Sequence, residues 1–353
     1  MKILDTTIRD GSYSVDFKFT CGDIKNAVSR LTKLGIDRIE IGHGLGLNAS
    51  SPERGISLCP DEAYLEAARE VSADAGIGMF CIPGIARKGD IASAKVHGLS
   101  FVRIGVTADN LSSAFPYLEE AQESGIVPMV NFMKSYIFEP AFLARQAKTA
   151  FNHGAETVYL VDSAGCMLPE EVGNAIAVIR GTVGKTGRLG FHGHNNLGLA
   201  VANSLAAVEN GADDIDCTFQ GIGRSLGNTP TETFVMAYKK KYGGAACPID
   251  IPRLLEYGYV LLKDIAPNRE ILNPLDLVCG YCGFHSSFLK DIFRCCNEKE
   301  VDPLRLIIAY TAFNRKTMDY EQLCRAADTL PKDDFEGHPY SFRRYFSNIY
   351  NDN

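Results

Sequence analysis

The stretch TVYLVDSAGCMLPEEVGNAIAVIRGTVGKTGRLGFHGHNN (157–196) decides the fold. It holds two short runs with the character of strands, TVYLVD (157–162) and RLGFHGH (188–194). The longer amphipathic run PEEVGNAIAVIRGTVG (169–184) separates them and ends in glycine, as helices commonly do. Two strands joined by a helix of this length predict a parallel pair with a helical crossover.

The same alternation runs through the first 245 residues or so. Helical runs such as GDIKNAVSRLTKLG (22–35) and LGLAVANSLAAVENG (197–211) lie between the strand candidates. Eight repeats over this length predict an α/β fold, a (β/α)₈ TIM barrel, with a doubly wound open sheet as the main alternative. The other six strand candidates are MKILDT (1–6), DRIEIG (37–42), IGMFCI (77–82), FVRIGV (101–106), IVPMVNF (126–132) and DDIDCTF (213–219).

The pattern changes after KKKYGGAACP (239–248), where helical runs follow one another and no alternating strand run returns. We therefore predict a barrel domain at 1–245 and a smaller C-terminal helical domain at 246–353.

Composition narrows the classes of function. The chain of 353 residues is 46% apolar and carries a dispersed net charge of −7, which argues against a nucleic-acid or membrane-surface protein. No export signal precedes MKILDTTIRDG and no apolar run is long enough to span a membrane, so we expect a cytoplasmic protein. In that compartment the eleven cysteines are expected to be reduced structural thiols.

The run FHGHNN (191–196) suggests a metal site. If it belongs to a strand, His192 and His194 project to the same face. Active sites of TIM barrels lie where the strands end, and Asp10 follows the first strand, two positions away around the barrel. One carboxylate and two imidazoles suit a divalent transition metal with open positions for substrate. The plainer alternatives are polar loop residues for the histidines and a turn residue for Asp10, which precedes Gly11.

Five motifs together carry a family resemblance. The chain resembles the metal-dependent pyruvate aldolases and the related lyases and synthases. These enzymes form the HMG-CoA lyase-like superfamily of Asp-Arg-Glu TIM-barrel metallolyases. Within it, the resemblance is to the 4-hydroxy-2-oxovalerate aldolases and extends over nearly the whole chain. The motifs are DTTIRDG (5–11), IEIGHG (39–44), VDSAG (161–165), HGHNNLGLAVANS (192–204) and GIGRSLGN (221–228).

The resemblance implies roles for individual residues. Asp10, His192 and His194 would hold a divalent metal, most favourably Mn²⁺, with Mg²⁺, Co²⁺ and Zn²⁺ as alternatives, and Asn228 would be a further metal or water ligand. Arg9 would stabilise an enolate oxygen, Glu40 would lie near Arg9, and Ser163 would contact substrate. The implied reaction cleaves or forms a carbon–carbon bond through a metal-stabilised pyruvate enolate.

The sequence departs from the aldolases at three positions. They have a catalytic histidine where this chain has Tyr13, and a tyrosine where the helical domain has His285, within GYCGFHSSF. We expect His285 to act as acid/base with Tyr13 assisting, so that the helical domain completes the active site. Alternatively, the exchange is packing drift in a protein that has changed substrate or lost activity. The third departure is Arg224, in a loop that the aldolases build from small residues; it would receive an anionic group of the substrate, or form a surface salt bridge.

Two other functions compete with the lyase: a Claisen-type synthase acting on a 2-oxo acid, and a catalytically weak scaffold partner of another enzyme. The resemblance permits an aldehyde dehydrogenase partner, and we expect a homo-oligomer that takes a small 2-oxo acid and binds neither nucleic acid nor membrane.

Overall fold

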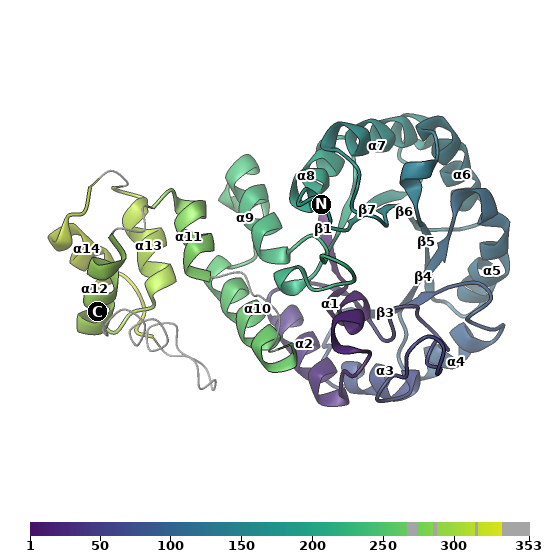
Figure 1. Ribbon diagram of the computed structural model, residues 1–353, viewed down its shortest axis with the longest axis horizontal. Helices are drawn as coiled ribbons and strands as arrows, with labels where there is room; N and C mark the ends of the chain where they lie inside the picture. Colours follow the sequence, from purple (N-terminus) through teal and green to yellow (C-terminus); the bar gives the residue numbers. More distant parts are fainter. Residues whose placement is uncertain (267–273, 285–287, 315–316, 334–353) are drawn as a thin grey trace. The chain divides into compact units, whose positions relative to one another are not determined.

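The first part of the chain is a closed barrel of eight parallel strands (Figure 1). The computed structural model describes residues 1–266, 274–284, 288–314 and 317–333. The strands pair in chain order, and β1 also pairs with β8, so the sheet closes and the doubly wound alternative is excluded. The strands are β1 (Lys2–Asp5), β2 (Arg38–Ile41), β3 (Gly76–Cys81), β4 (Phe101–Val106), β5 (Val127–Phe132), β6 (Thr157–Asp162), β7 (Arg188–Gly193) and β8 (Asp214–Cys217).

Helices surround the strands, as Figure 1 shows for α2 to α8. The TIM barrel predicted from the sequence is therefore confirmed, and each of the eight strand candidates overlaps one strand. The helices of this part are α1 (Thr7–Gly11), α2 (Cys21–Lys33), α3 (Asp61–Arg69), α4 (Asp90–Val96), α5 (Phe115–Glu123), α6 (Pro140–Asn152), α7 (Pro169–Val183), α8 (Ala200–Glu209) and α9 (Thr231–Tyr242).

Local sequence signals set the helix ends. Thr20 begins α2 in a reciprocal capping box with Asp23, which satisfies backbone N–H groups that have no partner within the helix. Proline occupies the first turn of α6 and α7, where its missing N–H costs nothing. Gly35 follows α2 with a φ of 80°, a conformation that glycine adopts without a Cβ clash.

A layer of charged and polar side chains crosses the barrel interior. Arg103 of β4 is fully buried and contacts Glu40 of β2, Asp216 of β8 and the ring of Tyr159 of β6. These four residues come from alternate strands, which is how side-chain layers in TIM barrels are built. Such layers are usually apolar, so we call this one the ionic layer. Beside it, Leu4, Phe101, Met129 and Val161 pack with Tyr159 in an apolar cluster.

The chain divides into two compact units, Met1–Tyr238 and Lys239–Asn353. The described helices that begin in the second unit are α10 (Ile251–Ile265), α11 (Pro274–Cys282), α12 (Leu289–Lys299), α13 (Pro303–Thr311) and α14 (Tyr320–Ala327). Asp250, Asp302 and Asp319 cap the N-termini of α10, α13 and α14 through their side chains. Among the described residues, no helix has both the length and the apolar character that a membrane span requires.

Candidate active site

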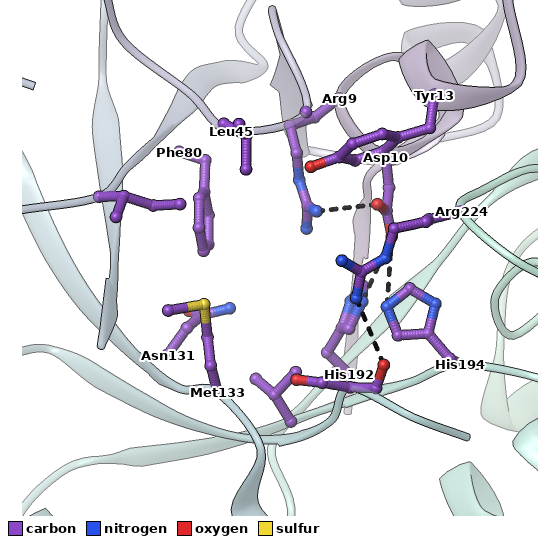
Figure 2. Close-up of a pocket in the computed structure, with 14 residues that line it drawn as sticks. Arg9, Asp10, Tyr13, Leu45, Phe80, Asn131, Met133, His192, His194 and Arg224 are labelled. Carbon is purple, nitrogen blue, oxygen red and sulfur yellow. Dashed lines mark hydrogen bonds and ion pairs between the residues drawn. The ribbon is translucent and has the colours of Figure 1, made fainter. Parts of the chain in front are cut away.

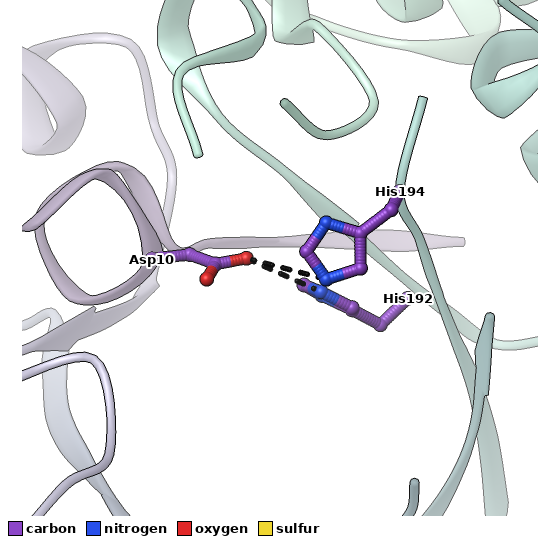
Figure 3. Close-up of side chains that lie close together, drawn as sticks. All are labelled: Asp10, His192 and His194. Atoms are coloured by element: carbon purple, nitrogen blue, oxygen red, sulfur yellow. Dashed lines mark ion pairs between the residues drawn. The ribbon is translucent and has the colours of Figure 1, made fainter. Parts of the chain in front are cut away.

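Asp10, His192 and His194 meet at the mouth of the barrel (Figure 3). One carboxylate oxygen of Asp10, Oδ2, lies 3.4 Å from Nε2 of His192 and 3.9 Å from Nε2 of His194. The ligand atoms of the three side chains all lie within 4.8 Å of one another, and all three residues are buried. The set predicted from the sequence is thus assembled in space.

The backbone explains this convergence. His192 is the penultimate residue of β7 and His194 follows the strand, so the alternation of strand side chains points both rings to one side. The backbone of His194 is paired with that of Asn228. Asp10 lies in α1, which begins directly after β1, and its N–H donates to the carbonyl of Thr6. Asp10 is therefore a helical residue whose side chain enters the site, and the alternative of a turn residue is wrong.

Asn228 contacts the same carboxylate oxygen. Its Nδ2 donates to Oδ2 of Asp10 over 2.7 Å, while its Oδ1 is buried and accepts no hydrogen bond from a described residue. The hydrogen bonds decide which atom of the Asn228 amide is the oxygen and which is the nitrogen. If a cation replaced the hydrogen bond to Asp10, the amide would turn and present its oxygen to the cation. Its position suits the further ligand that the resemblance implied.

The ionic layer lies behind these residues and holds them. His192 donates from Nδ1 to Oδ2 of Asp216 over 2.8 Å, which orients the ring and leaves Nε2 facing Asp10. Arg9 donates from Nε to Glu40 over 2.6 Å and lies 3.2 Å from the second oxygen of Asp10. Arg103 binds both Glu40 and Asp216. Glu40 does not line the pocket itself and acts on the site through Arg9.

Sequence reasoning missed Arg103, Asp216 and Asn131. Arg103 and Asn131 stand within otherwise apolar strands, FVRIGV and IVPMVNF, whereas Asp216 stands in DDIDCTF beside a second buried aspartate; all three residues are buried. A buried charge or amide in a strand needs a buried partner, and that was the available signal. Asn131 lines the pocket, and its Oδ1 has no hydrogen-bond partner among the described residues.

The electrostatics favour a ligand set of one anion and a neutral imidazole. Burial opposes ionisation of Asp10, but Arg9 and the two histidines outweigh it and hold the pKa of Asp10 well below its usual value. Burial lowers the pKa of His194 to about 4, against the attraction of Asp10. Burial also lowers the pKa of His192, but its hydrogen bonds with Asp10 and Asp216 raise that pKa above its usual value. A cation bound between Asp10 and His192 would therefore displace a proton from His192.

The donor set fits a divalent metal ion. Two imidazole nitrogens and a carboxylate oxygen lie together, and a carboxylate orients one imidazole from behind. The described residues offer no fourth side chain of this kind at the site, which is the open coordination that substrate needs. The same observations leave room for Mn²⁺, Mg²⁺, Co²⁺ or Zn²⁺.

A pocket of about 80 Å³ opens in front of these residues, enough for several water molecules or one small ligand (Figure 2). Leu45, Phe80, Ile82, Met133 and Val161 form its apolar wall. The polar lining comprises Arg9, Asp10, Tyr13, Asn131, Ser163, His192, His194 and Arg224.

The two substrate-binding candidates, Ser163 and Arg224, are neighbours. Oγ of Ser163 accepts from the N–H of Lys134 over 2.9 Å, and its carbonyl accepts from Arg224 over 3.4 Å. Tyr13 lies beside them, with its ring 5.8 Å from the Arg224 guanidinium. Burial, opposed by Arg9, raises the pKa of Tyr13, so its hydroxyl stays protonated at neutral pH. His285, the other predicted catalytic residue, lies outside the described residues.

The remaining motifs are structural. His43 stacks on Phe17 at 4.1 Å, its Nδ1 accepts from the N–H of Leu45, and its Nε2 contacts the carbonyl of Gly55 at 3.2 Å. Both ring nitrogens are thereby occupied. Among the described residues no two cysteines form a disulfide.

The fold and the site place the chain in a known class of protein. It belongs to the HMGL-like family, whose model matches residues 1–260. It is 36% identical over 296 residues to 4-hydroxy-2-oxovalerate aldolase 4 of Rhodococcus opacus (strain B4), covering 84% of each chain. It is 37% identical over 284 residues to an oxaloacetate decarboxylase of Mycobacterium tuberculosis, covering 80% of this chain and 83% of that one.

Solved structures agree on the fold. The hydroxymethylglutaryl-CoA lyase of Pseudomonas aeruginosa superposes with a TM-score of 0.60 at 20% identity, over 75% of this chain and 93% of the lyase. The carboxyl transferase domain of Rhizobium etli pyruvate carboxylase gives a TM-score of 0.63 at 16% identity, over 94% of this chain and 61% of that structure. The predicted resemblance to the metallolyase superfamily and to 4-hydroxy-2-oxovalerate aldolases is confirmed.

Proposed function

We propose that this protein is a divalent-metal-dependent lyase of the pyruvate aldolase type, which cleaves or forms a carbon–carbon bond next to the enolate of a 2-oxo acid. The observation that carries the proposal is the buried group of Asp10, His192 and His194 with Arg9 beside it in one pocket. The relatives support it, because they include proteins named 4-hydroxy-2-oxovalerate aldolase.

Arg9 is positioned to stabilise a negative oxygen. Arg9 is 6% exposed, and its guanidinium is held by Glu40, by Asp10 and by the face of Phe80, whose centroid lies 4.9 Å away. A cation fixed in a site with little water stabilises charge that develops during a reaction more strongly than a mobile one. A metal ion held by Asp10, His192 and His194 would supply Lewis acidity toward the keto oxygen of the substrate.

The acid/base group is proposed from the sequence. A protonated Tyr13 donates a hydrogen bond readily but accepts a proton poorly, so Tyr13 does not replace the histidine of the aldolases by itself. We propose that His285 removes and returns the proton at the methyl carbon, with Tyr13 assisting.

The variants His285→Ala and Tyr13→Phe separate these roles. We expect His285→Ala to slow aldol cleavage by about 10²-fold or more, the usual contribution of a general base, and Tyr13→Phe to slow it by about tenfold. Both rates are measured with saturating Mn²⁺. Aldol cleavage that is unaltered in His285→Ala would remove the role proposed for His285.

Decarboxylation is a second candidate function. The 37% identical relative is named an oxaloacetate decarboxylase. Loss of CO₂ generates the enolate without any base and then requires only a proton donor, which suits a protonated Tyr13. A Claisen-type synthase and a scaffold with little activity are further alternatives, and an aldehyde dehydrogenase partner stays a prediction.

The proposed function is tested by proton exchange. The methyl group of pyruvate is followed by NMR in deuterated water, with Mn²⁺ kept low to limit line broadening. We expect exchange that requires protein and metal together and stops on chelation. Exchange that is absent with pyruvate and with other 2-oxo acids would contradict the proposal; loss of CO₂ from oxaloacetate in that case would favour the decarboxylase.

A further inference from the structure

Arg224 is held at the mouth of the pocket by its backbone. The loop after β8 is closed by hydrogen bonds from the N–H of Gly227 to the Arg224 carbonyl, 3.0 Å, and from the N–H of Asn228 to the Gly221 carbonyl, 3.1 Å. Oγ of Ser14 donates to the carbonyl of Gly223 over 2.9 Å, which ties the loop to the segment that carries Tyr13. The side chain therefore starts from a defined position.

The guanidinium of Arg224 has only neutral partners in the described part of the chain. The guanidinium forms a long hydrogen bond to the carbonyl of Ser163 and lies over the face of Tyr13. No described carboxylate forms an ion pair with it, whereas Arg9 and Arg103 each bind carboxylates. The alternative of a surface salt bridge, left open by the sequence, finds no partner among the described residues. Most of its five donors remain for a ligand.

Arg224 lines the same pocket as Arg9 and Asp10, and Figure 2 shows its guanidinium beside Tyr13, near the two histidines. The end of the substrate that carries the 2-oxo acid is assigned to Asp10, His192, His194 and Arg9 by the proposed function. An anionic group that reaches Arg224 must then belong to the other end of the substrate. A planar fork of N–H donors matches a carboxylate with two parallel hydrogen bonds.

We propose that Arg224 binds a carboxylate carried by the aldehyde fragment, so that the substrate is a 4-hydroxy-2-oxo dicarboxylic acid and the acceptor is an oxo acid. This inference rests on the proposed function and names the class of its second substrate. Ser163 positions the Arg224 side chain through the Ser163 carbonyl, and Tyr13 positions it through the Tyr13 ring.

The charge of that carboxylate distinguishes aldol cleavage from decarboxylation. In aldol cleavage the distal carboxylate stays on the departing aldehyde and keeps its charge, so an ion pair with Arg224 favours substrate and transition state alike. In decarboxylation the distal carboxylate becomes neutral CO₂, and an ion pair to it stabilises the substrate more than the transition state. An arginine at this place therefore suits the aldolase better than the decarboxylase.

The reaction balances without a further reactant. In the synthetic direction the methyl carbon of pyruvate loses a proton, and the enolate carbon forms a bond to the aldehyde carbon of the oxo acid. The electron pair of that carbonyl becomes an alkoxide, which takes up one proton. Cleavage is the reverse, and the carboxylate on Arg224 is not altered in either direction.

Matched acceptors test the proposal. Glyoxylate and acetaldehyde differ by a carboxylate, as do 4-oxobutanoate and butanal, and the two pairs sample different distances to Arg224. For each protein, kcat/KM with pyruvate and Mn²⁺ is measured for both members of a pair. We expect wild type to prefer the anionic member and Arg224→Met to reduce this preference about tenfold or more, the effect of a lost charged hydrogen bond. Arg224→Lys, which keeps the charge and loses the fork, should fall between them.

A binding measurement gives a readout apart from turnover. 2-Oxoglutarate and 2-oxopentanoate have the same chain length and differ only in the distal carboxylate, and their affinities are compared by calorimetry. We expect the ratio to fall in Arg224→Met. The control is Lys88→Met, which removes one exposed positive charge whose side chain does not line the pocket.

The outcomes separate this inference from the proposed function. Unchanged ratios in Arg224→Met, or equal changes in Lys88→Met, overturn the role of Arg224; pyruvate exchange that persists in wild type then leaves the proposed function standing. Wild type without metal-dependent exchange and without condensation overturns both.

Discussion

Replacing Asp10 by alanine is expected to reduce metal-dependent proton exchange at pyruvate by about 10³-fold or more, because a metal contributes several kcal/mol and each 1.4 kcal/mol is about tenfold. Asp10 is the only carboxylate in the cluster with His192 and His194, and both histidines approach one of its oxygens. The exchange is measured by NMR, and Mn²⁺ binding is followed independently by electron paramagnetic resonance. Both signals should disappear together.

The control for this variant is Asp74→Ala, which removes an exposed carboxylate of the same unit. It should retain both the exchange and the Mn²⁺ signal. Thermal unfolding of Asp10→Ala must show a folded protein for the comparison to count. Full exchange with Mn²⁺ still bound in Asp10→Ala would mean that the metal lies elsewhere.

Replacing Arg103 by methionine is expected to lower the free energy of unfolding by about 3–5 kcal/mol. The change leaves Glu40 and Asp216, both buried, without their shared cation. The cost reflects two buried carboxylates that each lose one of their partners more than the loss of a favourable pair, because buried ion pairs contribute little over apolar replacements. Urea denaturation measures the change.

A triple variant separates charge from shape. Arg103→Met combined with Glu40→Gln and Asp216→Asn removes all three charges and should recover much of the lost stability. Catalysis should not recover with it, because Glu40 holds Arg9 and Asp216 holds His192. A loss below about 1 kcal/mol in the single variant would show that water or another cation reaches the two carboxylates.

The sequence predicted the parts of this molecule that depend on local pattern. Period-two and period-3.6 runs placed the strands, and closure of the barrel followed from the number and regularity of the units. His192 and His194 could be paired because strand alternation is rigid. Asp10 could be joined to them because the ends of β1 and β7 lie at one rim of the barrel.

The rest depends on which side chains meet inside the barrel, and linear spacing carries little of that. Arg103 and Asp216 are 113 positions apart and meet because β4 and β8 contribute to the same layer. The short helix α1 was not predicted, since five residues give too few turns for a periodic signal. The proposed exchange between Tyr13 and His285 rests on resemblance alone, and the described residues do not include His285.

The ionic layer also bears on how such an enzyme changes what it accepts. The guanidinium of Arg103 binds both Glu40 and Asp216, and it thereby sets the spacing between Arg9 and His192. Ser163 and Arg224, in contrast, lie on the loops after β6 and β8. The residues proposed to form the enolate and the residues proposed to select the acceptor are thus held by different parts of the barrel. Random variation of residues 222–227 would then explore new acceptors in a library whose members keep the ability to form an enolate.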